Sequence, residues 1–253
     1  MQHRPKRSLG QNFLRDRSVV DRIIGALDVS PGEPVIEIGP GQGALTERLI
    51  KLGADVTAIE FDRELAPALR DRFLGANISV IEADALEVDF ANLVGHPPAK
   101  LVANLPYNIS TPILQRLIEH RDVFSLLVLM FQKEVVERIA AEPGNKERGF
   151  LSVVAQNAFE IEYLFDVPPG AFYPVPKVWS SVVRLTPKPS SEFDKKVREV
   201  VSLAFAQKRK TLANNIRSIH PNASQILKAL GLPEKCRAEE LSLDDWHRLV
   251  AQL

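Results

Sequence analysis

Apolar residues in the first two thirds of the chain alternate between short continuous runs and runs with helical spacing. Segments 44–52 and 63–73 place their apolar residues on one side of a helix. Continuous apolar strands joined by helices are typical of a parallel sheet that is covered on both faces. The pattern therefore predicts an α/β domain whose first strands cover residues 34–39, 54–60, 78–83, 100–104 and 125–131.

The strand pattern changes after residue 160. Two further strand-like runs, 161–167 and 180–185, are joined by the proline-rich segment 168–176 without a helix between them. Because parallel strands need a long crossover connection, we expect these two runs to pair as an antiparallel hairpin at the edge of the sheet.

The strand signal disappears beyond residues 186–191, a Thr-Pro-Lys-Pro-Ser-Ser stretch that is typical of a linker. Helical patterns follow, with Gly231 suited to a helix C-cap and Ser242, three residues before Asp245, suited to an N-cap. The sequence thus predicts an α/β domain over 1–187 and a small helical domain over 188–253, with helices at 193–206, 210–219, 223–230 and 243–253.

Composition and charge narrow the function classes. With 45% hydrophobic residues, the 253-residue chain can bury a sizeable core. Its 32 basic and 32 acidic residues balance, which argues against a protein that coats nucleic acid through bulk charge but leaves local patches open. Two such patches are indicated, one formed by Arg4, Lys6 and Arg7 and the other by Lys208, Arg209 and Lys210. Trp179 and Trp246 are assigned to packing.

A soluble, cytoplasmic protein is expected. The longest apolar run, 126–131, is far too short to cross a bilayer, and no apolar stretch follows the basic first residues as it would in a secretory signal. The single cysteine, Cys236, excludes an intramolecular disulfide and fits a reducing compartment.

A glycine-rich loop joins the first predicted strand to the first helix, with Gly39, Gly41 and Gly43 at alternate positions. Glycines let a backbone turn tightly and approach a ligand, and open α/β sheets bind ligands at the carboxyl ends of their strands. Acidic residues stand at three of those ends. Glu60 could hold ribose hydroxyls and Asp84 an adenine amino group, and both, with Glu37, would suit a positively charged sulfonium. The loop favours S-adenosylmethionine.

A nicotinamide dinucleotide is the alternative at this point. Glu60 follows Gly39 by 21 residues (60 − 39), the spacing of the ribose-binding acid in dinucleotide folds. However, Gly43 comes one position too early for the G-x-G-x-x-G pattern. A dehydrogenase therefore stays open, with S-adenosylmethionine favoured.

The tetrapeptide Asn104-Leu105-Pro106-Tyr107 follows the fourth predicted strand and indicates methyl transfer to an exocyclic amine. The Asn104 side-chain oxygen and the Leu105 carbonyl can each accept one N–H of such an amine, and proline stiffens the turn that aims them. Catalysis is then mostly positioning with added electrostatics, and no strong general base is required. The face of Tyr107 can stack on the base.

With these motifs the chain resembles the ribosomal RNA adenine N6,N6-dimethyltransferases, the small-subunit type linked to kasugamycin sensitivity. The resemblance runs nearly end to end and implies a class I, Rossmann-like methyltransferase domain followed by a helical domain that docks RNA. Its further motifs are Ser8-Leu9-Gly10-Gln11-Asn12-Phe13-Leu14, Phe131-Gln132-Lys133-Glu134-Val135, Phe172-Tyr173-Pro174-Val175-Pro176-Lys177-Val178 and Phe205-Ala206-Gln207-Lys208-Arg209-Lys210-Thr211-Leu212.

The resemblance also implies roles for single residues. In the motif that begins at Phe172, an aromatic residue, here Phe172, would face the target base opposite Tyr107. Lys208, Arg209 and Lys210 would contact RNA phosphates. No metal is expected. The cofactor contacts carried over to this sequence are Asn12, Leu14, Gly39, Gly41, Glu60, Asp84 and Asn104.

The substrate implied by the resemblance is a pair of adjacent adenosines in the 3′-terminal hairpin loop of small-subunit rRNA, within an immature 30S-type subunit. Target bases can be splayed from such a single-stranded loop at low cost. A monomer is expected. Three alternatives stay open: an erythromycin-resistance type enzyme acting on large-subunit rRNA, a ribosome-assembly factor in which methylation is secondary, and, with less support, a DNA or protein-glutamine methyltransferase, which usually has Pro where this chain has Leu105.

Overall fold

The computed structural model describes residues 5–6 and 9–253. The chain divides into two compact units: Met1–Val136 with Ile161–Pro187, and Glu137–Glu160 with Lys188–Leu253. The second unit thus takes in 137–160, which the sequence-based division at residue 187 placed with the α/β domain. The physical reason is packing, because Val153 lies in the core of the second unit with Val197 and Val201.

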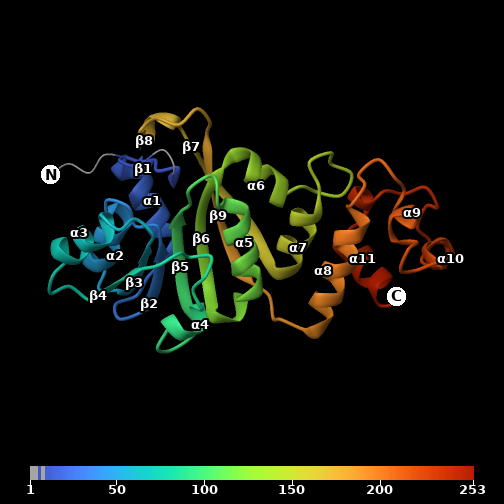
Figure 1. The fold of residues 1–253 in the computed structure, drawn as a ribbon, viewed down its shortest axis with the longest axis horizontal. Coiled ribbons are helices and arrows are strands. Elements are labelled where there is room, and N and C mark those ends of the chain that lie inside the picture. The colour runs from blue at the N-terminus through green and yellow to red at the C-terminus, as the bar shows by residue number, and fades with distance from the viewer. Residues whose placement is uncertain (1–4, 7–8) are drawn as a thin grey trace. The chain divides into compact units, whose positions relative to one another are not determined.

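The larger unit is built on a seven-stranded sheet of order β4-β3-β2-β5-β6-β9-β7 (Figure 1). The pairs β2–β3, β2–β5, β3–β4 and β5–β6 are parallel, whereas β6 and β9 are antiparallel. This confirms the Rossmann-like sheet with an antiparallel edge. The strands are β2 (Pro34–Ile38), β3 (Asp55–Glu60), β4 (Ile78–Glu82), β5 (Ala99–Asn104), β6 (Phe124–Gln132), β7 (Phe159–Val167) and β9 (Ser180–Pro187).

Helices of this unit begin where a polar residue caps them and apolar residues face the sheet. In α1 (Arg17–Leu27), the Asp16 carboxylate accepts from the backbone N–H of Ser18 and Val19. Its apolar side packs into the core with residues of the central strands. The other helices are α2 (Ala44–Lys51), α3 (Leu65–Arg72), α4 (Phe90–Leu93), α5 (Ser110–Glu119) and α6 (Lys133–Ile139), the last of which runs across the boundary between the units.

A two-stranded ribbon lies outside the main sheet. It pairs β1 (Phe13–Leu14) antiparallel with β8 (Phe172–Tyr173), so that Phe13 lies opposite Tyr173 and Leu14 opposite Phe172. The side chains of Leu14 and Phe172 are buried in the core of the unit. The ribbon therefore holds the amino-terminal segment against a part of the chain that is distant in sequence.

Apart from the first two residues of β7, the regular elements of the smaller unit are helices, as the sequence predicts for 188–253. Trp246 is fully buried in its core. Ser242 and Asp245 form a reciprocal capping box at α11, with the Asp245 N–H donating to the Ser242 hydroxyl at 3.1 Å. Its helices are α7 (Phe150–Ala158), α8 (Glu192–Ala204), α9 (Leu212–Ile216), α10 (Ala223–Ala229) and α11 (Leu243–Val250).

The two tryptophans differ sharply. Packing is the correct assignment for Trp246 but the wrong one for Trp179, which is 50% exposed. Trp179 directly precedes β9, in the segment that connects the ribbon to the main sheet. Among the described residues, no helix has the length and apolar character needed to span a membrane.

Candidate active site

Three neighbouring strands end at the same level of the sheet. Ile38 at the end of β2 pairs with Ile59 of β3 and with Ala103 of β5. The next residue of each strand therefore emerges at one edge, and these residues are Gly39, Glu60 and Asn104. Open parallel sheets bind their ligands at this edge, so the register alone brings three predicted site residues together.

The glycine loop needs its glycines for two different reasons. Gly39 has φ +66°, and a Cβ at this position would meet nothing within 4 Å, so a ligand can approach the bare backbone here. Gly41 has φ +57°, and its Cβ would lie 2.9 Å from the ring of Phe13. Only glycine therefore allows Phe13 to lie against the loop.

Cavities open on the carboxyl edge of the sheet around Gly39. One of about 140 Å³ is lined by residues that include Gln11, Gly39, Glu60, Asp84, Pro106 and the apolar Ile38, Ile59 and Ala85. A second, of about 60 Å³, shares Gln11, Gly39, Glu60 and Pro106 with it and adds Asn12, Phe13, Gly41, Asn104, Leu105 and Tyr107. Because the two cavities share four residues, they form neighbouring parts of one site.

Glu60 is a buried carboxylate at the junction of these cavities. Its oxygens accept from the N–H of Gly41 at 3.0 Å and from the N–H of Asp62 at 2.8 Å. Burial is the main cause that raises the pKa of Glu60, against the lowering effect of these N–H donors. The side chain thereby ties the end of β3 to the glycine loop.

Glu37 is still more buried, and it lies behind the glycine loop. It lines a third cavity, with Leu14, Gly39, Gly41 and Asn104. Its carboxylate accepts from the Thr46 hydroxyl at 2.6 Å. Burial raises its pKa to about 7, the hydroxyl opposes this, and the charge of Glu60 adds to it. The strand-end acids thus separate, with Glu60 and Asp84 on the main cavity and Glu37 beside the loop.

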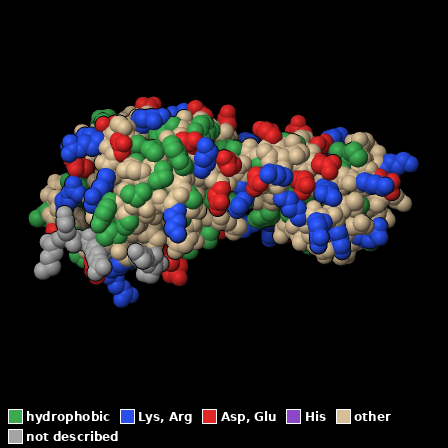
Figure 2. Space-filling model, turned by 90° about the horizontal axis from the view of Figure 1, so that it is seen from above, with side chains coloured by type: hydrophobic (Ala, Val, Ile, Leu, Met, Phe, Trp, Pro, Cys, Tyr) green, Lys and Arg blue, Asp and Glu red, His purple; other side chains and the backbone are tan. Residues whose placement is uncertain are grey.

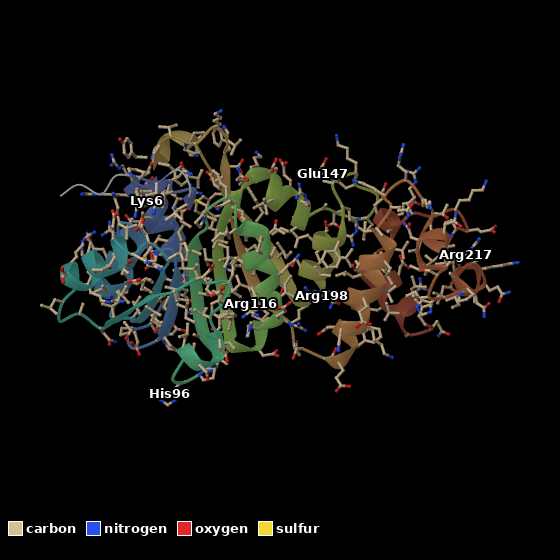
Figure 3. All side chains as sticks on the ribbon, viewed as in Figure 1. Lys6, His96, Arg116, Glu147, Arg198 and Arg217 are labelled. Atoms are coloured by element: carbon tan, nitrogen blue, oxygen red, sulfur yellow. The ribbon has the colours of Figure 1, made fainter. Side chains whose placement is uncertain are left out.

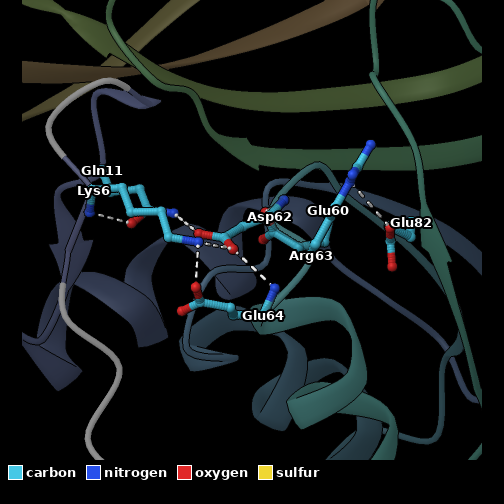
Figure 4. A network of polar contacts seen from close by, with 7 residues as sticks. All are labelled: Lys6, Gln11, Glu60, Asp62, Arg63, Glu64 and Glu82. Atoms are coloured by element: carbon cyan, nitrogen blue, oxygen red, sulfur yellow. Dashed lines mark hydrogen bonds and ion pairs between the residues drawn. The ribbon is translucent and has the colours of Figure 1, made fainter.

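The amino-terminal segment is tied to the site by a polar network (Figure 4). The Asp62 carboxylate, whose side chain has no exposed surface, accepts from Lys6 Nζ at 2.7 Å and from Gln11 Nε2 at 2.8 Å. Lys6 also pairs with Glu64 at 3.0 Å. Since Gln11 lines both main cavities, Asp62 fixes a wall of the site from outside it.

Asn104 and its successors are held by backbone groups. The Asn104 side-chain NH₂ donates to the Asn12 carbonyl at 3.1 Å, so the side-chain oxygen of Asn104 takes no part in this hydrogen bond. The Leu105 N–H donates to the Met130 carbonyl at 3.3 Å, and the Pro106 carbonyl accepts from the Ser110 hydroxyl at 3.1 Å. The tetrapeptide is therefore a fixed turn between β5 and α5.

Tyr107 is anchored through its hydroxyl. That oxygen lies 3.1 Å from Ser180 Oγ at the start of β9, and burial raises the pKa of the phenol. A ring held at its far end can present its face without swinging.

Other predicted site residues lie apart from these cavities. Phe172 is 3% exposed, packs in the core and lines none of the three cavities described. The run Lys208–Lys210 is exposed in the smaller unit, where Lys208 Nζ contacts the Lys146 carbonyl. In the predicted amino-terminal patch, Lys6 is paired, whereas Arg4, Arg7 and the motif residue Ser8 lie outside the described residues.

Comparison with known proteins decides the family. Residues 2–253 match the family described as ribosomal RNA adenine dimethylase. The chain belongs to this family. The resemblance inferred from the motifs is thereby confirmed, and the strand-end cavity belongs to a dimethylase fold rather than to a dehydrogenase.

Curated relatives match this chain over almost its whole length. Two proteins named ribosomal RNA small subunit methyltransferase A are similar: the one from Syntrophotalea carbinolica is 47% identical over 99% of this chain and 97% of its own length. That from Hahella chejuensis is 44% identical over 98% of this chain and 92% of its own length.

Solved structures share the fold at lower identity. A dimethyladenosine transferase from Plasmodium falciparum is 28% identical with a TM-score of 0.79, over 95% of this chain and 96% of that chain. The 23S rRNA methyltransferase ErmE is also 28% identical, with a TM-score of 0.76, over 96% of this chain and 99% of that chain. These likenesses confirm the class I methyltransferase fold.

Sequence reasoning missed several residues that shape the site. Asp62 follows a strand end as an ordinary loop acid, and Ser180 begins a strand, so neither carries a local signal. Phe13 belongs to the amino-terminal motif, but its contact with Gly41 follows only from the tertiary structure. Glu37 is predicted as a strand-end acid, but its near-neutral pKa follows from its burial and from the neighbouring charge of Glu60, which only the tertiary structure gives.

Glu37 makes stability fall as pH rises. Because its pKa in the folded protein is about 7 against an ordinary 4.5, the folded state binds the extra proton between these values, and the free energy of unfolding declines across that window. We expect Glu37→Gln to remove up to about 3 kcal/mol of this decline. Urea unfolding at pH 5 and pH 8 measures it, with the exposed Glu87→Gln as the matched control. Equal pH dependence in wild type and Glu37→Gln would refute the assignment.

Asp62 should control cofactor affinity without touching the cofactor. In Asp62→Asn the charge that holds Lys6 and Gln11 is lost, so the amino-terminal wall loosens; we expect S-adenosylmethionine to bind about tenfold more weakly. Calorimetric titration gives the affinity, and hydrogen exchange of residues 9–13 should rise in parallel. Asp71→Asn, on the exposed side of α3, is the control. Weaker binding without faster exchange would contradict the tethering explanation.

Proposed function

We propose that this dimethylase transfers methyl groups from S-adenosylmethionine to N6 of two adjacent adenosines in the 3′-terminal hairpin loop of small-subunit rRNA, giving N6,N6-dimethyladenosine. The observation that carries the proposal is the fixed Asn104–Tyr107 turn on the wall of a cavity that also holds Gly39 and Glu60. Its support for the small subunit is the name that the curated relatives share.

The residues around the cavity fit S-adenosylmethionine. Apolar Ile38, Ile59 and Ala85 beside the Asp84 carboxylate suit a purine ring with an amino group at its edge. Glu60 can accept from ribose hydroxyls while the open backbone at Gly39 admits the chain of the cofactor. We assign Asn12, Leu14, Gly41 and Asn104 to the part near the sulfonium, since all four line the adjoining cavities. When bound, the cofactor supplies an electrophilic methyl group.

The chain's own residues orient the amine. With its NH₂ bound to the Asn12 carbonyl, Asn104 offers its side-chain oxygen to one N–H of adenine N6, and the Leu105 carbonyl accepts the other. The nitrogen lone pair is then localised and can form the new N–C bond as the S–C bond breaks. The methylated nitrogen carries a positive charge, becomes acidic and releases its proton to water. Tyr107, tethered to Ser180, stacks on the base.

Phe172 keeps a place in the proposed base site, but as a residue behind its wall. Phe172 belongs to β8, and its buried ring joins the ribbon to the core of the unit; the ribbon in turn presents Phe13 to the glycine loop. Phe172 is therefore a positioning residue in this proposal.

Docking is assigned to the smaller unit. The exposed Lys208, Arg209 and Lys210 are proposed to contact phosphates of the rRNA within an immature 30S-type subunit. We propose that the enzyme acts as a monomer, in the cytoplasm where subunits mature.

Two alternatives are separable by experiment. The likeness to ErmE equals that to the dimethyladenosine transferase in identity, so the fold alone does not choose between ribosomal subunits. An assembly factor in which methylation is secondary would bind precursor subunits whether or not it transfers methyl groups.

The target is tested by labelling. Radiolabelled S-adenosylmethionine is incubated with unmodified small subunits and, in parallel, with large subunits, and the label is mapped by nuclease digestion and mass analysis. We expect N6,N6-dimethyladenosine in the 3′-terminal hairpin of small-subunit RNA. Label on large subunits alone would move the chain to the resistance type, and label on neither would favour the assembly factor.

Asn104→Ala should separate chemistry from docking. It removes the oxygen that positions the amine, and we expect kcat to fall about 10² to 10³-fold, the usual loss for one preorganised polar contact. Binding to precursor subunits, measured by co-sedimentation, should stay unchanged. Asn92→Ala, on the exposed side of α4, is the control. A kcat near the wild-type value would remove Asn104 from the mechanism.

A further inference from the structure

Exposed apolar side chains are concentrated in one short segment. Of the nine large hydrophobic residues that are exposed in the described part of the chain, four lie within Tyr173–Trp179, which we call the rim segment. They are Tyr173, Val175, Val178 and Trp179, with exposures from 42% to 65%. The other five are scattered along the sequence. Figure 2 shows hydrophobic side chains gathered on the face of the larger unit that is seen from above.

Both ends of the rim segment are anchored on the active site. At its start, Tyr173 pairs with Phe13, which lines the cavity beside Asn104. At its end, the Trp179 carbonyl accepts from the Lys133 N–H at 3.0 Å, and the next residue, Ser180, contacts the Tyr107 hydroxyl at 3.1 Å. The exposed residues therefore stand at the border of the proposed base site on a backbone that is fixed at both ends.

Positive charge accompanies the apolar residues. The Arg15 guanidinium lies over the Tyr173 ring, 4.1 Å from its centre. Lys177 is exposed between Val175 and Val178. Aromatic faces interleaved with cations are the surface that single-stranded nucleic acid requires, since bases stack on the rings while cations meet phosphates. A packing role for Trp179 would instead bury it, as it does Trp246.

We propose that the rim segment binds the nucleotides that flank the target adenosine, with one flanking base stacked on Trp179. The inference rests on the proposed function, because it takes RNA as the substrate. When the target base enters the cavity, its neighbours in the loop leave their own stacks and need a new apolar surface. Trp179 and Tyr173 offer that surface at the site entrance, and Arg15 and Lys177 offer charge for the adjoining phosphates.

The first test is the substrate dependence of methylation. Trp179→Ala should raise KM for unmodified small subunits about tenfold or more, since stacking of one base contributes about that factor. We expect kcat and the affinity for S-adenosylmethionine to stay at wild-type values, and Trp179→Phe to restore most of KM. Leu74→Ala removes an apolar side chain that is still more exposed, at 90%, elsewhere in the same unit and is the control. A KM for Trp179→Ala within twofold of wild type would overturn the inference while leaving the proposed function intact.

The second test does not need methylation. The chain has two tryptophans, so Trp246→Phe leaves Trp179 as the single reporter. Titration with a single-stranded, adenosine-containing RNA oligonucleotide should quench its emission through stacking and shield it from iodide. Binding of the oligonucleotide is measured separately by the fluorescence anisotropy of a labelled oligonucleotide. Stacking on Trp179 would be refuted if the oligonucleotide bound without changing the emission, or if it did not bind at all. A shift of wild type, but not Trp179→Ala, to a larger species in sedimentation would instead assign the rim segment to a second copy of the chain.

Discussion

The site depends on the parallel register of β3, β2 and β5. Since Ile38 pairs with both Ile59 and Ala103, the residues that follow leave the sheet together at its carboxyl edge. Gly39, Glu60 and Asn104 are thus juxtaposed by backbone hydrogen bonds that any apolar strand sequence could make. A slip of one residue in either pairing would turn these side chains to the opposite face. The register of the sheet thus positions the functional groups at the strand ends.

A second constraint closes the site from the amino-terminal side. Glu60 binds the Gly41 N–H, Asp62 binds Gln11, and the Asn12 carbonyl fixes the Asn104 amide, so each wall of the cavity is hydrogen-bonded to another. The β1–β8 ribbon extends this connection from the glycine loop to the rim segment. Because the proposed cofactor and RNA contacts share the same short ribbon, we expect ordering by one ligand to lower the cost of ordering for the other.

Local sequence patterns predict most of the fold and the centre of the site. Apolar runs located the strands, and the glycine loop with the Asn104–Tyr107 turn located the cavity. What they could not give is any contact between distant segments. Val153 belongs to the core of the second unit because it packs against α8, and Phe172 is buried where β8 pairs with β1. Trp179 is exposed, although its apolar side chain alone favours burial. Hydrophobicity makes the burial of a side chain favourable, but only the tertiary structure determines whether the side chain is buried.

The electrostatics of the strand-end acids favour a cationic ligand. Burial raises the pKa of both Glu37 and Glu60, and the charge of Glu60 further disfavours ionisation of Glu37. A buried carboxyl whose ionisation is disfavoured by burial and by a neighbouring carboxylate is relieved by a cation beside it, since opposite charge favours the ionised form. A sulfonium near Gly39 would be such a cation, whereas the pyrophosphate of a dinucleotide would add to the repulsion. The acids that left the cofactor open in the sequence thereby favour S-adenosylmethionine once their burial is known.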